Sequence, residues 1–330
     1  MVVVAGCGGY VPLYRIERDT IAAQFGESGR GESAVPARDE NHVTLACEAA
    51  ETALARAALA GDDLDAVLAA SVTDPFAEHG IAAHVAYRLG ATGDVRTGDF
   101  RATPRAATDA LFAARDAVEA TESTVLVVAS DVLPAESGDD DEQYAGAGAG
   151  AVVLAPDADA PAASLTGWGQ ETTGFVERHR EHGERARSGD ARFERRHGVA
   201  PATEAAVERA LDGGEAPARA VASAPDARLA RTALRSVDAE RVSTFDDVGS
   251  AGVASFFLDL AHLLETTDAG TPALAACYGA GGADAVALEV GSGSTEGPTV
   301  SALLDAKEYV TYAKHLEYRR PVEYQGVNRA

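Results

Sequence analysis

A threonine–proline pair before an alanine-rich helical run is the first place where this chain could do chemistry. Residues 99–111 (DFRATPRAATDAL) are predicted to be a strand end that runs into a helix. The hydroxyl of Thr103 could attack an acyl group, but a threonine hydroxyl needs an adjacent general base to become nucleophilic. Threonine is also a favoured helix N-cap, and proline a favoured first helical residue. We therefore favour a capping role for Thr103 and keep the nucleophile as the alternative.

Three cysteines offer thiol chemistry. Cys7, Cys47 and Cys277 are far apart in the sequence, which supports neither a disulfide framework nor a CxxC metal site. Two of them fall in predicted strand ends and the third in a predicted helix. We expect each thiol to fill a small apolar position in the core.

The histidines and a cluster of arginines have two interpretations each. His79 is interpreted as a surface residue, with a displaced acid–base role as the alternative. His179 and His182 lie three residues apart in a charged stretch, where a solvated loop is favoured over a metal-binding pair. The arginines of residues 178–196 either balance the acidic residues between them or contact a phosphate group of a ligand.

Acidic residues dominate the charge of this chain. There are 52 acidic against 28 basic residues, giving a net charge of −24, and Lys307 and Lys314 are the only lysines. Such a surface suits a protein that stays hydrated in high salt, where screening removes self-repulsion. We interpret the chain as a cytoplasmic protein of a halophile, with an ordinary acidic enzyme as the alternative. Without a basic patch, nucleic acid is an unexpected partner.

Apolar segments alternate between strand-like and helix-like patterns, as in stacked α/β layers. No apolar run approaches the twenty residues of a membrane span, so we expect no contact with a membrane. Each half ends in a glycine-rich strand pair, which suggests a duplicated α/β unit. The predicted helices cover residues 43–59, 81–89, 104–118, 201–211, 227–236 and 252–264, and the predicted strands residues 2–5, 66–70, 124–130, 147–154, 219–222, 273–278 and 283–290.

Five segments resemble the thiolase-fold condensing enzymes, and most of all the archaeal type of hydroxymethylglutaryl-CoA synthase. Residues 6–16 (GCGGYVPLYRI) resemble that group's opening GYGAYIPxYRI, and residues 70–77 (ASVTDPFA) resemble its GSESHPYA turn. Residues 193–197 (FERRH) are similar to a YFKH segment, residues 278–285 (YGAGGADA) to YGSGAGSDAF, and residues 309–314 (YVTYAK) to a YxxYxK ending. These matches follow one another in the right order over nearly the whole chain.

The resemblance implies a five-layer αβαβα fold, built from two halves related by a pseudo-twofold axis. These halves would be residues 1–160 and 161–297, followed by a tail of residues 298–330 that could dock a partner. The resemblance also implies a dimer and a reaction on acyl-CoA. That reaction transfers an acyl group to a cysteine thiolate. An oxyanion hole stabilises the charge that develops on the acyl oxygen, and a glutamate transfers protons.

The residues that carry this chemistry in the family are replaced here. The resemblance aligns the nucleophilic cysteine with Pro104, the histidine of an HQPNGK segment with Ser223, the asparagine of a GNTxxAS turn with Ser250, and the glutamate of the SESHP turn with Val72. Neither proline nor valine offers a reactive group. We therefore expect none of these four positions to be catalytic.

Several positions of the pattern could still bind acyl-CoA, which would then be a ligand; no other cofactor is expected. These positions are Thr103, Arg228, Gly279, Gly281 and Gly282.

Two functions follow from the resemblance. The first is a catalytically degenerate scaffold or subunit, a pseudoenzyme. It would pair with itself, with an active thiolase or synthase, or with a zinc-ribbon/OB-fold protein. The alternative is an active acyltransferase with a rebuilt site, in which Thr103, Ser223 or Ser250 carries the acyl group or polarises its carbonyl. A sensor or carrier that binds acyl-CoA without reacting is a third possibility.

Overall fold

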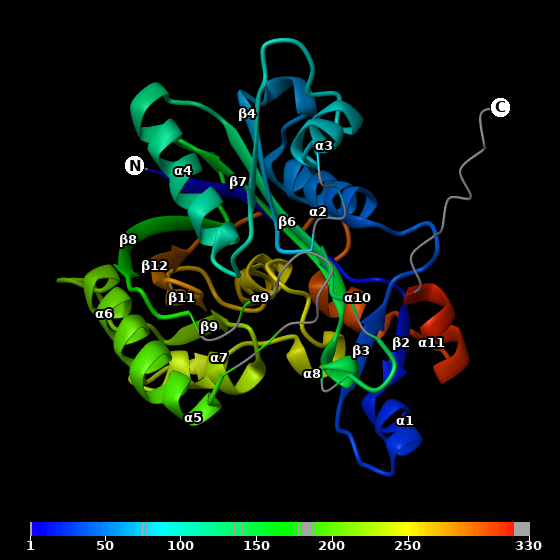
Figure 1. Cartoon of the computed structure of the whole chain (residues 1–330). Coiled ribbons are helices and arrows are strands. Elements are labelled where there is room, and N and C mark those ends of the chain that lie inside the picture. Colours follow the sequence, from blue (N-terminus) through cyan, green and yellow to red (C-terminus); the bar gives the residue numbers. More distant parts are fainter. Residues whose placement is uncertain are drawn as a thin grey trace.

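A ten-stranded sheet is the centre of the fold (Figure 1). The computed structural model describes residues 2–73, 76, 78–134, 136–139, 141–176, 179, 187 and 189–319. The sheet has the order β10-β9-β11-β12-β8-β1-β7-β6-β4-β5. Its first half contains β1 (Val3–Tyr10), β4 (Ala66–Ser71), β5 (Arg96–Arg101), β6 (Val125–Val132) and β7 (Ala147–Ala155), and its second half β8 (Ala163–Thr172), β9 (Arg219–Ser223), β10 (Glu240–Arg241), β11 (Pro272–Gly279) and β12 (Gly282–Val290).

The strand order of the first half recurs in the second. When the five strands of each half are numbered in chain order, their order across the sheet is 3-2-4-5-1 in both halves. Strand 5 is antiparallel to both of its neighbours, and strands 4, 2 and 3 are parallel to one another. The halves meet where β1 pairs with β8, at Val3 opposite Ser164. The chain is therefore built from two copies of one α/β unit.

Helices form three layers around the two half-sheets. α2 (His42–Ala57) and α3 (Ala82–Arg88) pack on the first half, and α6 (Ala200–Ala210) and α7 (Ala227–Ala233) pack on the second. α4 (Ala106–Thr121) and α9 (Ala254–Glu265) lie between the halves, and α9 contacts both β7 and β9. The layers alternate as αβαβα, with buried apolar clusters at the junctions.

Small residues allow these layers to approach closely. A Cβ on Gly6 would lie 2.2 Å from the carbonyl oxygen of Ala53 in α2, and one on Gly150 would lie 2.6 Å from main-chain atoms of α9. Helix α2 begins at His42, one residue before the predicted start. The Asn41 side chain caps it by accepting hydrogen bonds from the amides of its first turn. Alanine and glycine thus replace large side chains at the contacts between layers.

The described part of the C-terminal tail is folded onto an N-terminal arm. The arm consists of β2 (Tyr14–Glu17), α1 (Arg18–Ala22) and β3 (Glu32–Val35), and the tail of α10 (Val300–Asp305), β13 (Glu308–Tyr309) and α11 (Tyr312–Arg319). β13 extends the β2–β3 pair, and Figure 1 shows α11 beside this arm. Arg319 donates hydrogen bonds to the carbonyls of Leu133, Ala34 and Ala145. Residues up to Arg319 are therefore part of the body, and partner docking by the tail stays a prediction.

Two further short helices are α5 (Ala191–Phe193) and α8 (Phe245–Val248). Among the described residues, no helix combines the length and the apolar character needed to cross a bilayer.

Candidate functional site

The four positions aligned with the family's chemistry lie at equivalent places in the two halves. Val72 directly follows β4, and Ser223 ends β9, the corresponding strand of the second half. Pro104 lies between β5 and α4, and Ser250 lies between β10 and α9. Val72, Pro104 and Ser223 thus lie at or just after the carboxyl ends of parallel strands, and Ser250 lies in the longer connection from β10 to α9, after α8. In open α/β sheets this edge is where ligands bind.

Main-chain and side-chain contacts connect Pro104 with Ser223. The thiol of Cys277 donates a hydrogen bond of 3.4 Å to the Pro104 carbonyl. Cys277 in β11 lies opposite Ser223 in the parallel pair β11–β9. Gly279 brings the end of β11 close to the turn, since a Cβ there would lie 3.1 Å from the Pro104 ring. The segments of Pro104 and Ser223, more than a hundred residues apart in the chain, are therefore connected through β11.

Asp131, at the end of β6, connects the turn of Val72 with the turn of Ser250. It is fully buried and accepts hydrogen bonds from the amides of Val72 at 3.0 Å, Thr73 at 2.9 Å and Val253 at 2.7 Å. The hydroxyls of Ser71 and Thr73 donate to the same carboxylate. One buried charge therefore orders the loops that follow β4 and precede α9.

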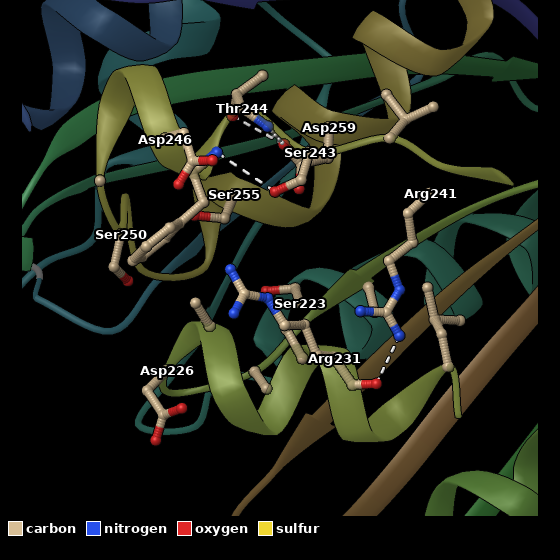
Figure 2. Close-up of a pocket in the computed structure, with 18 residues that line it drawn as sticks. Ser223, Asp226, Arg231, Arg241, Ser243, Thr244, Asp246, Ser250, Ser255 and Asp259 are labelled. Atoms are coloured by element: carbon tan, nitrogen blue, oxygen red, sulfur yellow. Dashed lines mark hydrogen bonds between the residues drawn. The ribbon is translucent and has the colours of Figure 1, made fainter. Parts of the chain in front are cut away.

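Ser223 and Ser250 line one cavity between α7 and the loop from β10 to α9 (Figure 2). Figure 2 shows Ser223 and Arg231 on the side of α7, and Ser243, Ser255 and Asp259 across the space from them. The remaining lining is partly apolar. It comprises Ala222, Ala224, Asp226, Ala227, Ala230, Leu234, Arg241, Val242, Thr244, Phe245, Asp246 and Gly249.

Helix α4 begins later than the sequence predicts. Its first helical residue is Ala106 and its N-cap is Arg105, so Pro104 is not the first helical residue. The Thr103 hydroxyl accepts a 3.3 Å hydrogen bond from the Arg105 amide, and its other contact is the Ala280 carbonyl at 3.5 Å. The prediction that Thr103 is the N-cap was therefore wrong by two residues. Arg105 is the N-cap, and Thr103 closes a turn just before the helix. Neither contact is a general base.

A buried ion pair lies beside this turn. Arg105 donates two hydrogen bonds of 2.8 Å to Asp284 in β12, and the Thr108 hydroxyl donates a third. Burial alone would lower the pKa of Arg105, but the hydrogen bonds and charge of Asp284 raise it. The pair joins the first-half helix α4 to the second half of the sheet. Gly282 faces it, since a Cβ there would lie 3.2 Å from the Arg105 guanidinium.

No thiol replaces the missing nucleophile. Cys277 is fully buried, and its desolvation raises the pKa of its thiol far above the usual value, which keeps it protonated. Burial raises the pKa of Cys7 to about 11 and also raises that of Cys47. All three cysteines are free and buried, as the sequence predicts.

The other predicted residues lie outside the cavity. Arg228 is exposed on α7, whose N-cap Asp226 accepts from the Arg228 amide. Gly281 has a φ of 89° and turns the β11–β12 hairpin. His79 is exposed, also has a positive φ, and packs its ring on Phe76 at 4.1 Å.

His179 and His182 were assigned to a solvated loop, with a metal-binding pair as the alternative, and His182 lies outside the described residues. Within the described part of the chain, no cluster of three or more potential metal ligands occurs.

Comparisons with known proteins agree with this architecture. No protein-family model matches the chain. The chain is 27% identical to the hydroxymethylglutaryl-CoA synthase of Methanopyrus kandleri over 345 residues, which cover 97% of this chain and 98% of that one. The Pyrococcus horikoshii synthase is 32% identical over 185 residues, or 54% of this chain and 53% of that one.

Solved structures extend the likeness to the fold. The HMG synthase of the curacin biosynthetic pathway, in complex with its acetyl donor carrier protein, has a TM-score of 0.80 at 18% identity and covers 96% of this chain and 88% of its own. MvaS in complex with 3-hydroxy-3-methylglutaryl coenzyme A has a TM-score of 0.77 at 20% identity, with 97% and 92% covered.

The fold and the order of the strands define a thiolase-fold protein. Over nearly its whole length the chain is similar in sequence to archaeal hydroxymethylglutaryl-CoA synthases.

Proposed function

We propose that this chain is a catalytically degenerate member of the synthase-like group, which acts as a subunit or scaffold in acyl-CoA metabolism. One observation carries the proposal. The four strand-end positions converge, yet they hold Pro104, Ser223, Ser250 and Val72 and so lack a thiol, an imidazole, a carboxamide and a carboxylate. Acyl transfer in this fold depends on such groups acting together.

The neighbouring groups also support a silent site. The thiol of Cys277 donates a hydrogen bond to the main-chain carbonyl of Pro104 and is fully buried. The Thr103 hydroxyl contacts main-chain atoms. A carbonyl carbon would therefore find no activated nucleophile at the start of α4.

The proposed partner is a second thiolase-fold chain, either another copy or an active synthase. In the described part of the sheet, β5 pairs on one side only, with β4, and ends the sheet with a row of available main-chain groups. Such an edge accepts a strand from another chain. Light scattering of the purified protein in molar KCl should give twice the mass of one chain. A monomer that also fails to co-purify with a co-expressed synthase would refute the proposed pairing.

We further propose that the protein works in the cytoplasm of a halophilic organism. The net charge of −24 and the two lysines support a high-salt setting, and three free buried cysteines are compatible with a reducing one. Acyl-CoA is a proposed ligand, supported by relatives solved with CoA or HMG-CoA.

A second function is favoured by one feature, the shared cavity of Ser223 and Ser250. In that alternative the protein is an acyltransferase with a rebuilt site. The discriminating assay follows CoA release from acetyl-CoA or acetoacetyl-CoA with a thiol reagent. Release that disappears in Ser223→Ala or Thr103→Ala would establish the acyltransferase, whereas release at the rate of a buffer blank supports the degenerate subunit.

A further inference from the structure

Two arginines line the cavity without an acidic partner. Arg231 comes from α7 and Arg241 from the end of β10, and Arg241 donates a hydrogen bond to the main-chain carbonyl of Arg231. Within the described residues, no carboxylate forms an ion pair with either guanidinium, although Glu240 next to Arg241 pairs with Arg219. An unpaired pair of cations is unexpected in a chain with a net charge of −24.

The acidic residues of the cavity have other partners. Asp226 accepts from the amides of Arg228 and Leu229 at the start of α7. Asp259 is buried and accepts from the amide and hydroxyl of Thr244, and burial raises its pKa to about 6. The remaining carboxylate, Asp246, is exposed like the two arginines and forms no ion pair with either of them. The two arginines are therefore not neutralised by the cavity itself.

Two hydroxyl groups are available beside the arginines. Ser223 is 4% exposed and lines the cavity, and no atom of the described chain hydrogen-bonds its hydroxyl. The Ser250 side chain likewise has no partner among the described residues, although its main chain is paired with Tyr144 and Gly146. Figure 2 shows Ser223 near the arginines and Ser250 at one end of the space.

Both arginines are exposed, and the charge of one acts on the other. Burial lowers the pKa of Arg241, and the charge of Arg231 lowers it further. An oxyanion between them would relieve this repulsion and accept charge-assisted hydrogen bonds from both.

We propose that this cavity binds the carboxylate or phosphate group of a small organic anion, held by Arg231 and Arg241 and by the hydroxyls of Ser223 and Ser250. Binding is non-covalent and involves no thioester. The inference therefore holds whether or not the protein has lost acyl transfer.

Calorimetric titration of the full chain tests the proposal, with potassium concentration held constant. The probes are inorganic phosphate and succinate, with potassium chloride as the reference anion. Arg231→Gln and Arg241→Gln remove one guanidinium each. Arg235→Gln is the matched control, because it makes the same charge change just after α7 at a residue that does not line the cavity.

We expect saturable binding of phosphate or succinate, and whichever binds identifies the head group. Loss of one charge-assisted hydrogen bond should weaken that binding about tenfold in each cavity variant and by less than about twofold in the control. Because both arginines are exposed and neither forms an ion pair with a described carboxylate, each cavity variant should unfold close to the wild-type temperature. Ser223→Ala provides a second, smaller perturbation.

Two results would overturn the inference. One is no heat of binding for either probe beyond that of chloride. The other is an equal loss of affinity in Arg235→Gln, which would mean that the anions respond to general surface charge. Neither result bears on the proposed loss of catalysis, since neither probe can acylate the protein.

Discussion

Replacing Arg105 with methionine should destabilise the fold more than any surface ion pair could. The substitution removes two hydrogen bonds of 2.8 Å and leaves the fully buried Asp284 carboxylate with the Thr108 hydroxyl and the Gln170 amide. Breaking one side of a buried ion pair costs about 3–5 kcal/mol, because the remaining charge is uncompensated. That is a large part of the total free energy of unfolding of a typical protein, which is about 5–15 kcal/mol.

The assay is urea unfolding followed by circular dichroism at constant KCl, since guanidinium would itself screen the ion pair. Arg209→Met is the matched control. Its Arg209–Glu171 pair is 2.6 Å long, but the two side chains are 53% and 30% exposed, so we expect a loss of about 1 kcal/mol at most. The double variant Arg105→Met with Asp284→Asn removes the stranded charge and should recover much of the loss.

A loss in Arg105→Met no larger than in the control would refute the reasoning. So would a double variant that is less stable than the single one, because the penalty would then not come from the buried carboxylate. The first result would mean that other contacts hold α4 to the second half-sheet.

Three further predictions concern other parts of the fold. Asp131→Asn should lower the free energy of unfolding by about 3 kcal/mol, because the carboxylate accepts hydrogen bonds from five donors. It should also speed hydrogen exchange at the Val253 amide, and unchanged exchange would contradict the role of Asp131 in ordering the two loops. Burial raises the pKa of Asp259 from 3.8 to about 6, so the folded state keeps a proton that the unfolded state loses. Stability should therefore fall by about 3 kcal/mol as pH rises through that window. Asp259→Asn should remove this fall, and identical pH profiles of variant and wild type would refute the assignment. A chain that ends at Gly297 should melt below one that ends at Arg319, because it lacks β13 and α11; equal melting temperatures would mean that the tail does not brace the arm.

Several long elements could be predicted from the sequence because their patterns are local, although the ten-residue strand β8 was not predicted. The apolar residues of α9 recur at helical spacing, and β6 begins with five consecutive apolar residues, so both were located within a few residues. The short strands β2 and β13 were not predicted. A strand of two to four residues has no pattern of its own and exists because a neighbour supplies its hydrogen bonds.

The candidate site was assigned from the family's order of segments, which carries no information on contacts between distant residues. The positions of Pro104, Ser223, Ser250 and Val72 could be found by alignment. The pair of Arg105 with Asp284 spans 179 residues and leaves no local signal. Asp131 did leave one, since a charged residue ends an otherwise apolar strand and must be satisfied when buried.

The central claim is that no residue of this chain accepts an acyl group. Intact-protein mass spectrometry after incubation with acetyl-CoA and acetoacetyl-CoA in molar KCl tests it most directly, with an active archaeal-type synthase labelled in parallel as the control. The account predicts an unchanged mass for this protein while the control gains an acetyl group. An acetyl adduct that maps to Thr103, Ser223 or Ser250 would contradict it and establish a rebuilt acyltransferase.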